Sequence, residues 1–487
     1  MNSQVSKLEP TSIWKNFVSL NSVPRPSKKE EKIINFLIKF AENNNLRYSL
    51  DEIGNLVIFK DATSDMVDRK TIVLQSHVDM VHEKNQDVQF NFDESGIQMY
   101  VDNGWVKAKG TTLGADNGLG VAAIMGILES SEISHPKIEA LFTIDEETGM
   151  TGALNLSDSI LNGKILLNLE TEEDDEICIG CAGGIDITVS NKFELETPRS
   201  EQSFLKITID GLTGGHSGAE IHKGLGNANK ILFSALAEIS TFCSLNICEI
   251  SGGGLRNAIP RECNVVISID NNKIDEVQNF LSQINLQNQI DLKPTDPNFS
   301  LTSIIVDFYD DQLTSLDSSA LINAINDCPN GVYKMSNSID GLVETSNNLA
   351  NIQFKNSELL LTCLTRSSVE SSKMELSDKI SNIFTKIGYK CSLSGGYPGW
   401  EPNVNSETLK NAISSYKRLF TNKPKVNVIH AGLECGIIGS HYPNMEMISF
   451  GPTILGAHSP DERASVNSTQ KFWIFFKEIL KNIPKSN

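Results

Sequence analysis

Predominantly apolar runs mark the strands expected near both ends of the chain. They lie at residues 71–76, 138–145, 165–169 and 445–450. Runs without strict polar alternation are typical of parallel strands that are covered by helices on both faces. A helical period fills residues 27–43, where apolar side chains recur every three or four positions. These segments predict an α/β domain with a mixed sheet flanked by helices.

The middle of the chain has another pattern, in which short strands alternate with amphipathic helices. The order strand, helix, strand, strand, helix occurs twice, over residues 204–286 and again over 302–387. The predicted strands are 204–210, 246–251, 262–269, 302–308, 349–354 and 358–364, and the predicted helices are 226–240, 272–286, 317–327 and 369–387. We therefore predict a duplicated domain at 190–396, inserted between the two parts of the first domain, 1–189 and 397–487.

Composition narrows the class of protein. With 487 residues, of which 39% are hydrophobic, the chain is long enough for more than one core. Its formal charge of −19 disfavours a nucleic-acid partner, because the field would repel phosphates. No run approaches the roughly 18 apolar residues of a membrane helix, and the first residues have no apolar core of a secretion signal. We expect a cytoplasmic protein that binds neither nucleic acid nor membrane.

Side chains that bind metals or transfer protons follow the predicted strands. His77 follows the first run, Glu146 and Glu147 the second, and Glu170 the third, while His458 follows the fourth after a short loop. Open α/β sheets bind ligands at the carboxyl ends of their strands, so we expect these side chains to converge. Taken singly, these residues also have ordinary structural explanations. Adjacent glutamates such as Glu146 and Glu147, for example, are common in solvated loops.

Asp79 lies two residues after His77. At this spacing its carboxylate can hold the second ring nitrogen and fix the tautomer of a metal-bound histidine. A hydrogen-bonded pair in the core is the alternative for so short a motif.

Asp116 lies in the glycine-rich segment 110–123, directly before an apolar helix. The run Gly118-Leu-Gly-Val-Ala-Ala123 resembles a dinucleotide-binding fingerprint. Asp116 precedes the first glycine of that run, where a carboxylate would repel a pyrophosphate, and no strand directly feeds the loop. A helix N-cap is the ordinary role of such an aspartate. Together with the carboxylates at the strand ends, Asp116 is better interpreted as part of a metal site.

The predicted cluster matches the needs of two zinc-like ions. Such ions lie about 3.5 to 4 Å apart and are held by imidazoles, separate carboxylates and one shared carboxylate. A structural zinc site would use cysteines, but the pair Cys178 and Cys181 has no second pair of the same spacing. We interpret these two cysteines as buried thiols and predict two divalent ions, Zn²⁺ with Mn²⁺ or Co²⁺ as alternatives.

Over nearly its whole length the sequence resembles the aminoacyl-histidine dipeptidases, also called peptidase D or Xaa-His dipeptidases. They belong to the co-catalytic zinc exopeptidases, which include the carnosinases. The resemblance is carried by Ser76-His-Val-Asp-Met80, Leu113-Gly-Ala-Asp-Asn-Gly-Leu-Gly120, Asp145-Glu-Glu-Thr-Gly-Met-Thr-Gly152, Gly180-Cys-Ala-Gly-Gly184, Gly214-Gly-His-Ser-Gly218, His430-Ala-Gly-Leu-Glu-Cys-Gly436 and Gly456-Ala-His-Ser-Pro460.

The resemblance implies a ligand set for each ion. These sets are His77, Asp116 and Glu170 for one ion, and Asp116, Glu147 and His458 for the other. It also implies that Asp79 orients His77 and that Glu146 is the general base. The family more often has Asp where Glu170 stands, so the carboxylate here carries one more methylene.

For the inserted domain the resemblance implies a lid of two ferredoxin-like halves. His216 would face the developing oxyanion, although a turn histidine bonded to its own backbone is the alternative. Asn257, Arg366 and Gly432 resemble the substrate-holding positions, and Arg is suited to gripping a carboxylate with two hydrogen bonds. A surface residue at a strand end is the alternative for Arg366, and His430 remains unassigned.

These expectations describe a cytosolic metallo-dipeptidase that hydrolyses Xaa-His and related dipeptides with free ends. A metal-bridging water would attack the peptide carbonyl, with Glu146 as its base. One alternative is a broader dipeptidase, a tripeptidase or an acylamino-acid deacylase. A catalytically inactive peptide-binding protein is another, but it would have lost Glu146 or a ligand. The chain is expected to act as a monomer or a homodimer.

Overall fold

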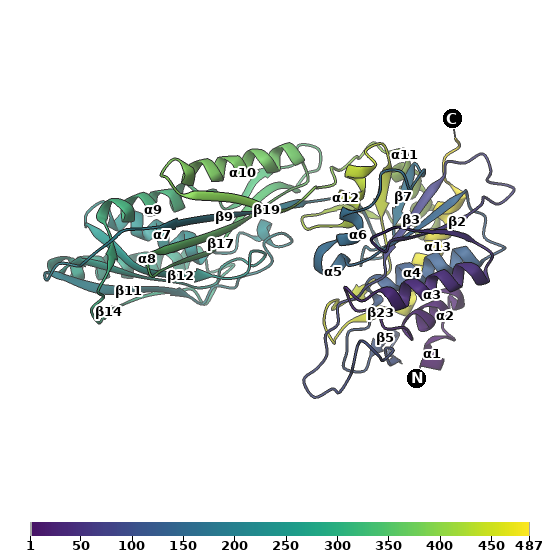
Figure 1. The fold of residues 1–487 in the computed structure, drawn as a ribbon, viewed down its shortest axis with the longest axis horizontal. Helices are drawn as coiled ribbons and strands as arrows, with labels where there is room; N and C mark the ends of the chain where they lie inside the picture. The colour runs from purple at the N-terminus through teal and green to yellow at the C-terminus, as the bar shows by residue number, and fades with distance from the viewer. Residues whose placement is uncertain (1, 487) are drawn as a thin grey trace. The chain divides into compact units, whose positions relative to one another are not determined.

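The computed structural model describes residues 2–486. The chain folds into two compact units, each built from segments that are separate in the sequence. Unit 1 comprises Met1–Gly180, Trp400–Val428 and Leu433–Asn487, and unit 2 comprises Cys181–Gly399 and Ile429–Gly432. The purple and yellow segments of Figure 1 therefore belong to the same unit.

Eight strands form the main sheet of unit 1, in the order β1-β2-β6-β3-β7-β21-β8-β20. Four neighbours, β6, β3, β7 and β21, run parallel to one another, so their carboxyl ends share one edge of the sheet. The strands are β1 (Arg47–Leu50), β2 (Leu56–Lys60), β3 (Ile72–His77), β6 (Ile138–Thr143), β7 (Ile165–Asn168), β8 (Glu176–Cys181), β20 (Lys425–Ile429) and β21 (Glu446–Ser449). The predicted mixed sheet is confirmed, including the four strands expected from the apolar runs.

Helices cover this sheet. The apolar helix expected after Asp116 is α4, which is buried along most of its length and contacts both α2 and β3. The helices of unit 1 are α1 (Asn2–Val5), α2 (Thr11–Leu20), α3 (Glu31–Asn43), α4 (Ala115–Glu129), α5 (Glu146–Gly149), α6 (Thr151–Leu154), α11 (Glu407–Phe420), α12 (Glu434–His441) and α13 (Val466–Lys481). Three phenylalanines of α13, at 472, 475 and 476, pack around Phe450 at the end of the central strand β21.

A second sheet of unit 1 has four short strands in the order β22-β23-β5-β4. They are β4 (Met99–Asp102), β5 (Trp105–Ala108), β22 (Ile454–Leu455) and β23 (Arg463–Ser465). β23 pairs antiparallel with β5, so that Ala464 lies opposite Val106. This pairing joins the segment that precedes Asp116 to the segment that follows His458.

Unit 2 is built on a nine-stranded antiparallel sheet in the order β14-β11-β13-β12-β17-β18-β9-β19, with β16 also paired to β17. The strands are β9 (Gly183–Lys192), β11 (Gln202–Asp210), β12 (Leu245–Gly253), β13 (Cys263–Asp270), β14 (Ser300–Val306), β16 (Gly331–Met335), β17 (Val343–Lys355), β18 (Glu358–Ser367) and β19 (Lys390–Tyr397). A separate pair is formed by β10 (Leu195–Glu196) and β15 (Gln312–Leu313).

The helices of unit 2 confirm the predicted alternation. They are η1 (Ile221–Lys223), α7 (Ala228–Ile239), η2 (Asn271–Lys273), α8 (Ile274–Asp291), α9 (Ser315–Asp327) and α10 (Glu370–Thr385). One hydrophobic core unites α7, α8, α9 and α10 with alternate residues of the strands, such as Leu205, Ile207 and Ile209 of β11. The four helices therefore cover the same face of the sheet, along which Figure 1 shows them lying.

The two halves of unit 2 are not arranged as the sequence predicts. Residues 302–308 were expected to open the second copy, but β14 pairs with β11 along residues 300–306 and so completes the first. The opening strand of the second copy is β9, which lies earlier in the chain and pairs with β18 and β19. The first half is thus inserted after the first strand of the second half. The order of strands along the chain does not reveal this nested arrangement, because the strands that pair with β9 lie more than 160 residues away.

Candidate active site

His77 ends β3 and is almost fully buried. Its Nδ1 lies 3.3 Å from Oδ1 of Asp79, and its Nε2 lies 3.2 Å from Oδ1 of Asp116. Asp79 also accepts hydrogen bonds from the Ser27 hydroxyl (2.8 Å) and from the backbone N–H of Glu146 (3.1 Å). The buried carboxylate of Asp79 is therefore fixed against one ring nitrogen, which directs the other ring nitrogen towards Asp116.

The carboxylate of Asp116 lies between two imidazoles. Its Oδ2 is 3.2 Å from Nε2 of His458, and its Oδ1 faces His77. Burial opposes ionisation of Asp116, but hydrogen bonds with His458 and His77 hold its pKa below the usual range. The chain reaches Asp116 through Gly114, whose φ of +68° is left-handed; a Cβ there would lie 2.5 Å from the guanidinium of Arg25. Only glycine suits that turn.

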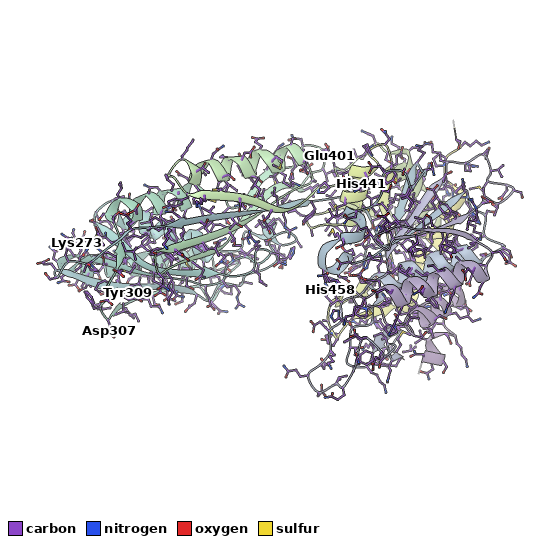
Figure 2. The ribbon with its side chains drawn as sticks, in the orientation of Figure 1. Lys273, Asp307, Tyr309, Glu401, His441 and His458 are labelled. Carbon is purple, nitrogen blue, oxygen red and sulfur yellow. The ribbon has the colours of Figure 1, made fainter. Side chains whose placement is uncertain are left out.

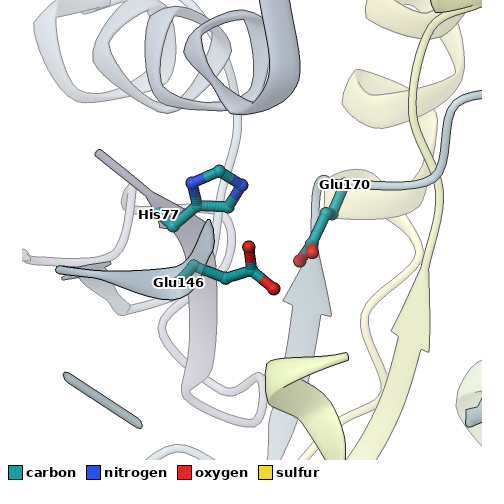
Figure 3. Close-up of side chains that lie close together, drawn as sticks. All are labelled: His77, Glu146 and Glu170. Atoms are coloured by element: carbon teal, nitrogen blue, oxygen red, sulfur yellow. The ribbon is translucent and has the colours of Figure 1, made fainter. Parts of the chain in front are cut away.

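Glu146 and Glu147 occupy the first turn of α5, directly after β6. Oε2 of Glu147 lies 3.0 Å from Nε2 of His458, while its Oε1 is buried and has no hydrogen-bond partner among residues 2–486. Glu146 turns instead towards His77 and Glu170, and potential ligand atoms of these three residues lie within 4.8 Å of one another (Figure 3). The two adjacent glutamates thus face different parts of one cluster.

Glu170 follows β7, and the side-chain amide of Asn168 hydrogen-bonds to its carboxylate. Its Oε2 accepts a hydrogen bond from Nδ2 of Asn168 (2.7 Å), which also donates to Oε1 of Gln75 (2.5 Å). Burial raises the pKa of Glu170, and burial together with the nearby carboxylates of Glu170 and Glu434 raises that of Glu146 well above its usual range. Carboxyl groups packed this closely raise one another's pKa unless a cation lies between them.

The nearby carboxylates raise the pKa values of His77 and His458. Burial opposes protonation of His77, but its bonds with Asp116 and Asp79 raise its pKa well above the usual range. For His458, hydrogen bonds with Asp116 and Glu147 raise the pKa to about 11. The side chain of His458, labelled in Figure 2, is 56% exposed on its loop, whereas that of Glu147 is 3% exposed. Divalent cations bound between these groups would neutralise the same carboxylates that raise the pKa values of the two histidines.

The donor set fits metal ions. Three groups of three side chains in the described residues are spaced closely enough to share an ion, and two of them contain His77: one with Asp116 and Glu147, the other with Glu146 and Glu170. The third group is Glu30, Asp79 and Asp145. His458 extends the first group through Asp116 and Glu147. Imidazole nitrogens and carboxylate oxygens are ligands that zinc and related ions accept. All seven residues of unit 1 that the sequence singles out therefore meet in one cluster: His77, Asp79, Asp116, Glu146, Glu147, Glu170 and His458.

Sequence reasoning missed several buried charged residues beside this cluster, among them Arg25 and Glu434. Arg25 donates to the backbone carbonyls of Val78 (3.0 Å) and Gly114 (2.6 Å), which joins the His77 strand to the Asp116 loop. Glu434 begins α12 and accepts hydrogen bonds from Gln75 and Thr143, both 2.6 Å long; burial raises its pKa to about 8. No recognised motif surrounds Arg25 in the sequence, whereas Glu434 lies within the motif at 430–436.

In unit 2, His216 has a defined tautomer. Its Nδ1 accepts hydrogen bonds from the backbone N–H groups of Gly218 (3.1 Å) and Ala219 (3.0 Å). Burial and the positive charge of Arg366 lower the pKa of His216. The neutral ring therefore carries its proton on Nε2, which makes that atom a hydrogen-bond donor.

Arg366 lies near His216 with much of its hydrogen-bonding capacity unused. Only 5% of the residue is exposed; Nη1 donates to the Tyr397 hydroxyl (2.9 Å), whereas Nε finds no partner within the described part of the chain. The neighbouring carboxylate of Asp186 pairs with Arg256. A buried guanidinium without a carboxylate partner is a suitable site for an anion.

The backbone at Gly218 packs closely against Arg366, His216 and His430. A Cβ at this position would lie 2.1 Å from the carbonyl oxygen of His430 and 3.1 Å from both Nε of Arg366 and Cε1 of His216. The imidazole of His430 hydrogen-bonds through Nε2 to the hydroxyl of Ser346 (2.8 Å). The loop must therefore have glycine where it meets Arg366.

The other two candidate residues of unit 2 belong to adjoining segments. Asn257 is exposed, and its carbonyl oxygen accepts a hydrogen bond from the backbone of Ser217 (2.8 Å). Gly432 ends the short segment Ile429–Gly432 that belongs to unit 2. The structure thus places Asn257 beside the His216 loop, and Gly432 two residues after His430.

Comparison with known proteins identifies the class to which this site belongs. The model of peptidase family M20/M25/M40 matches residues 73–482, so the chain belongs to that family. The resemblance noted from the motifs is confirmed, and the chain is a hydrolase of the metallopeptidase type.

Two relatives match nearly the full length. The chain is 39% identical to the cytosol non-specific dipeptidase of Escherichia coli (strain K12), over 99% of each protein. It is also 39% identical to the aminoacylhistidine dipeptidase of Vibrio alginolyticus, whose crystal structure matches with a TM-score of 0.95 over 99% of each chain. The aminopeptidase PepT of Bacillus cereus shares 16% identity and a TM-score of 0.57 over 98% of this chain, which shows the fold alone.

None of the helices in residues 2–486 has the length and apolar character needed to cross a membrane.

Proposed function

We propose that this protein is a dinuclear metallo-dipeptidase that hydrolyses Xaa-His and related dipeptides with free ends. The observation that carries the proposal is the Asp116 carboxylate, which faces Nε2 of both His77 and His458 in a buried cluster of further carboxylates. Identity of 39% over the full length to two dipeptidases supports the same activity here.

We propose the ligand sets His77, Asp116 and Glu170 for one ion and Asp116, Glu147 and His458 for the other. The orphaned Oε1 of Glu147 supports this assignment, since a buried carboxylate oxygen without a donor is suited to a cation. When bound, the two ions, Zn²⁺ or else Mn²⁺ or Co²⁺, would acidify a water molecule and polarise the peptide carbonyl. Asp79 would keep His77 in the required orientation.

Glu146 is proposed as the general base. It lies beside the ligands, in reach of His77 and Glu170, and its carboxylate accepts no hydrogen bond from the described residues that would occupy it. Its carboxylate would take a proton from the attacking water and then give it to the departing amine nitrogen. The same proton thus serves both steps, and the carboxylate is regenerated.

The cluster in unit 2 is proposed to bind the substrate. Arg366 would pair with the free C-terminal carboxylate, assisted by Asn257 and Gly432, because its buried guanidinium has no carboxylate partner among residues 2–486. His216 would donate from Nε2 to the carbonyl oxygen as negative charge develops on it. The tautomer that Gly218 and Ala219 impose supports this role.

Substrate preference is the finer part of the proposal. The Vibrio relative is named for aminoacyl-histidine substrates and the E. coli relative as non-specific. A broader dipeptidase, a tripeptidase or an acylamino-acid deacylase is therefore the alternative within the enzyme class. A catalytically inactive peptide-binding protein is disfavoured by the intact set of acidic and imidazole groups. We place the enzyme in the cytoplasm, like the E. coli relative, as a monomer or homodimer.

A panel of substrates tests this function. With zinc-loaded enzyme, we expect ready hydrolysis of Ala-His, β-Ala-His and Ala-Ala, with the histidyl dipeptides fastest. Ala-His-amide should be cleaved poorly because it lacks the carboxylate that Arg366 would bind. Release of free amino acids, measured at equal enzyme concentration, decides between the candidates. Faster cleavage of Ala-Ala than of Ala-His would favour the broader dipeptidase, and hydrolysis of N-acetyl amino acids alone would favour the deacylase.

A further inference from the structure

Glu462 has an unusual environment for a carboxylate. The residue is only 2% exposed, and it accepts four backbone hydrogen bonds from one loop. Oε2 accepts from the N–H groups of Leu113 (2.7 Å) and Gly114 (2.9 Å). Oε1 accepts from those of Ala115 (2.7 Å) and Asp116 (3.2 Å). Four consecutive N–H groups of the segment that delivers Asp116 thus converge on one side chain.

Glu462 also belongs to the loop that carries His458. This loop, between β22 and β23, is closed by its own hydrogen bonds: the N–H of Glu462 donates to the Ser459 carbonyl (3.0 Å), and the Ser459 hydroxyl donates to that of Gly456 (2.8 Å). His458, whose imidazole is exposed, has a left-handed backbone conformation with a φ of +64°. Since Glu462 is fixed within the same turn, its carboxylate ties the His458 loop to the Asp116 segment.

Arg25 holds the opposite side of that segment. Its Nη2 donates to the Gly114 carbonyl (2.6 Å), and its Nη1 donates to the carbonyls of Val78 (3.0 Å) and Asp79 (3.1 Å), just after His77. The Asp116 segment is therefore bonded to the His77 strand through Arg25 and to the His458 loop through Glu462. Arg25 and Glu462 thereby link the Asp116 segment to the two segments that carry His77 and His458.

A neutral acceptor cannot replace the carboxylate of Glu462 at this position. Burying a second carboxylate beside Asp116 adds repulsion between like charges, which a neutral acceptor would avoid. A glutamine in the same place offers only one acceptor oxygen, and its NH₂ group would face two N–H donors. The carboxylate is the side chain that can receive all four groups at once and so fix the direction of the loop.

We propose that Glu462 is a positioning residue, which holds the Asp116 carboxylate and His458 at the spacing needed for a divalent cation bound by Asp116, Glu147 and His458. This inference rests on the proposed function. The other cation would depend less on Glu462, because His77 and Glu170 stand at the ends of β3 and β7. Residues that orient ligands without touching the metal commonly change metal affinity 10- to 100-fold when replaced.

The test is calorimetric titration of the metal-free protein with Zn²⁺. Glu462→Gln should bind one of the two ions roughly 10- to 100-fold more weakly than the parent and should lose less affinity for the other. The matched control is Asp461→Asn, which removes a carboxylate from the exposed neighbouring position and should bind both ions like the parent. Parental affinity for both ions in Glu462→Gln would overturn the proposal.

A second variant protects the test against a folding defect. Glu462→Asp keeps the charge but withdraws it by one methylene, so a smaller loss of affinity for the same ion is expected. If circular dichroism showed both variants unfolded and the control native, Glu462 would be a folding residue and the proposal would be wrong. If the parent bound two ions and cleaved no dipeptide, the proposed function would fail while the positioning role could still hold.

Discussion

Glu146→Gln is expected to abolish dipeptide hydrolysis while the protein still binds two metal ions. The substitution preserves shape but removes the proton acceptor, and loss of a general base commonly lowers kcat roughly 100- to 10,000-fold. Metal content is expected to stay at the parental value because Glu146 is not among the proposed ligands. Metal analysis by mass spectrometry and the rate of Ala-His cleavage check this result.

Glu147→Gln is the matched comparison for that variant. It makes the same chemical change one residue further along α5, where Oε2 faces His458. We expect this variant to lose one ion, with activity falling as a consequence. If Glu146→Gln kept substantial activity, or if it lost metal while Glu147→Gln did not, the assignment of the two adjacent glutamates would be wrong.

Arg366→Ala is expected to weaken kcat/KM for Ala-His by tens to thousands of times. Removing one partner of a buried charge pair commonly costs roughly 2 to 5 kcal/mol. The effect should nearly disappear with Ala-His-amide, which has no carboxylate to lose. Steady-state kinetics with both substrates measure this, and an equal loss with the amide would show that Arg366 does not bind the carboxylate.

His216→Ala, in the same cluster, should have a different kinetic signature. A donor to the oxyanion acts mainly in the transition state, so kcat should fall roughly 100- to 1,000-fold with little change in KM. If KM rose and kcat stayed at the parental value, His216 would be a substrate-binding group instead.

The parts of the molecule that local chemistry determines were predictable from sequence. The buried strands β3, β6 and β7 follow from their apolar runs, and parallel strands bring His77, Glu146 and Glu170 to one edge. Asp116 was recognisable because its glycine loop leads into an apolar helix. In each case a short segment contains both the structural signal and the functional side chain.

Features that depend on distant partners were not predictable in the same way. Glu462 contacts residues about 350 positions earlier in the chain, and nothing near it in the sequence indicates four converging N–H groups. The membership of β14 in the first half of unit 2 was misassigned because pairing with β11, not position in the chain, determines it. Buried charges such as Arg25 and Glu434 belong to the same class, since their burial is a property of the folded protein.

The measurement that tests the central claim most directly is hydrolysis of Ala-His during titration of the metal-free protein with Zn²⁺. A dinuclear site predicts no turnover in the presence of a chelator and full activity at about two bound ions per chain. Full activity of the metal-free protein would contradict the account, as would a protein that held two ions and cleaved no dipeptide.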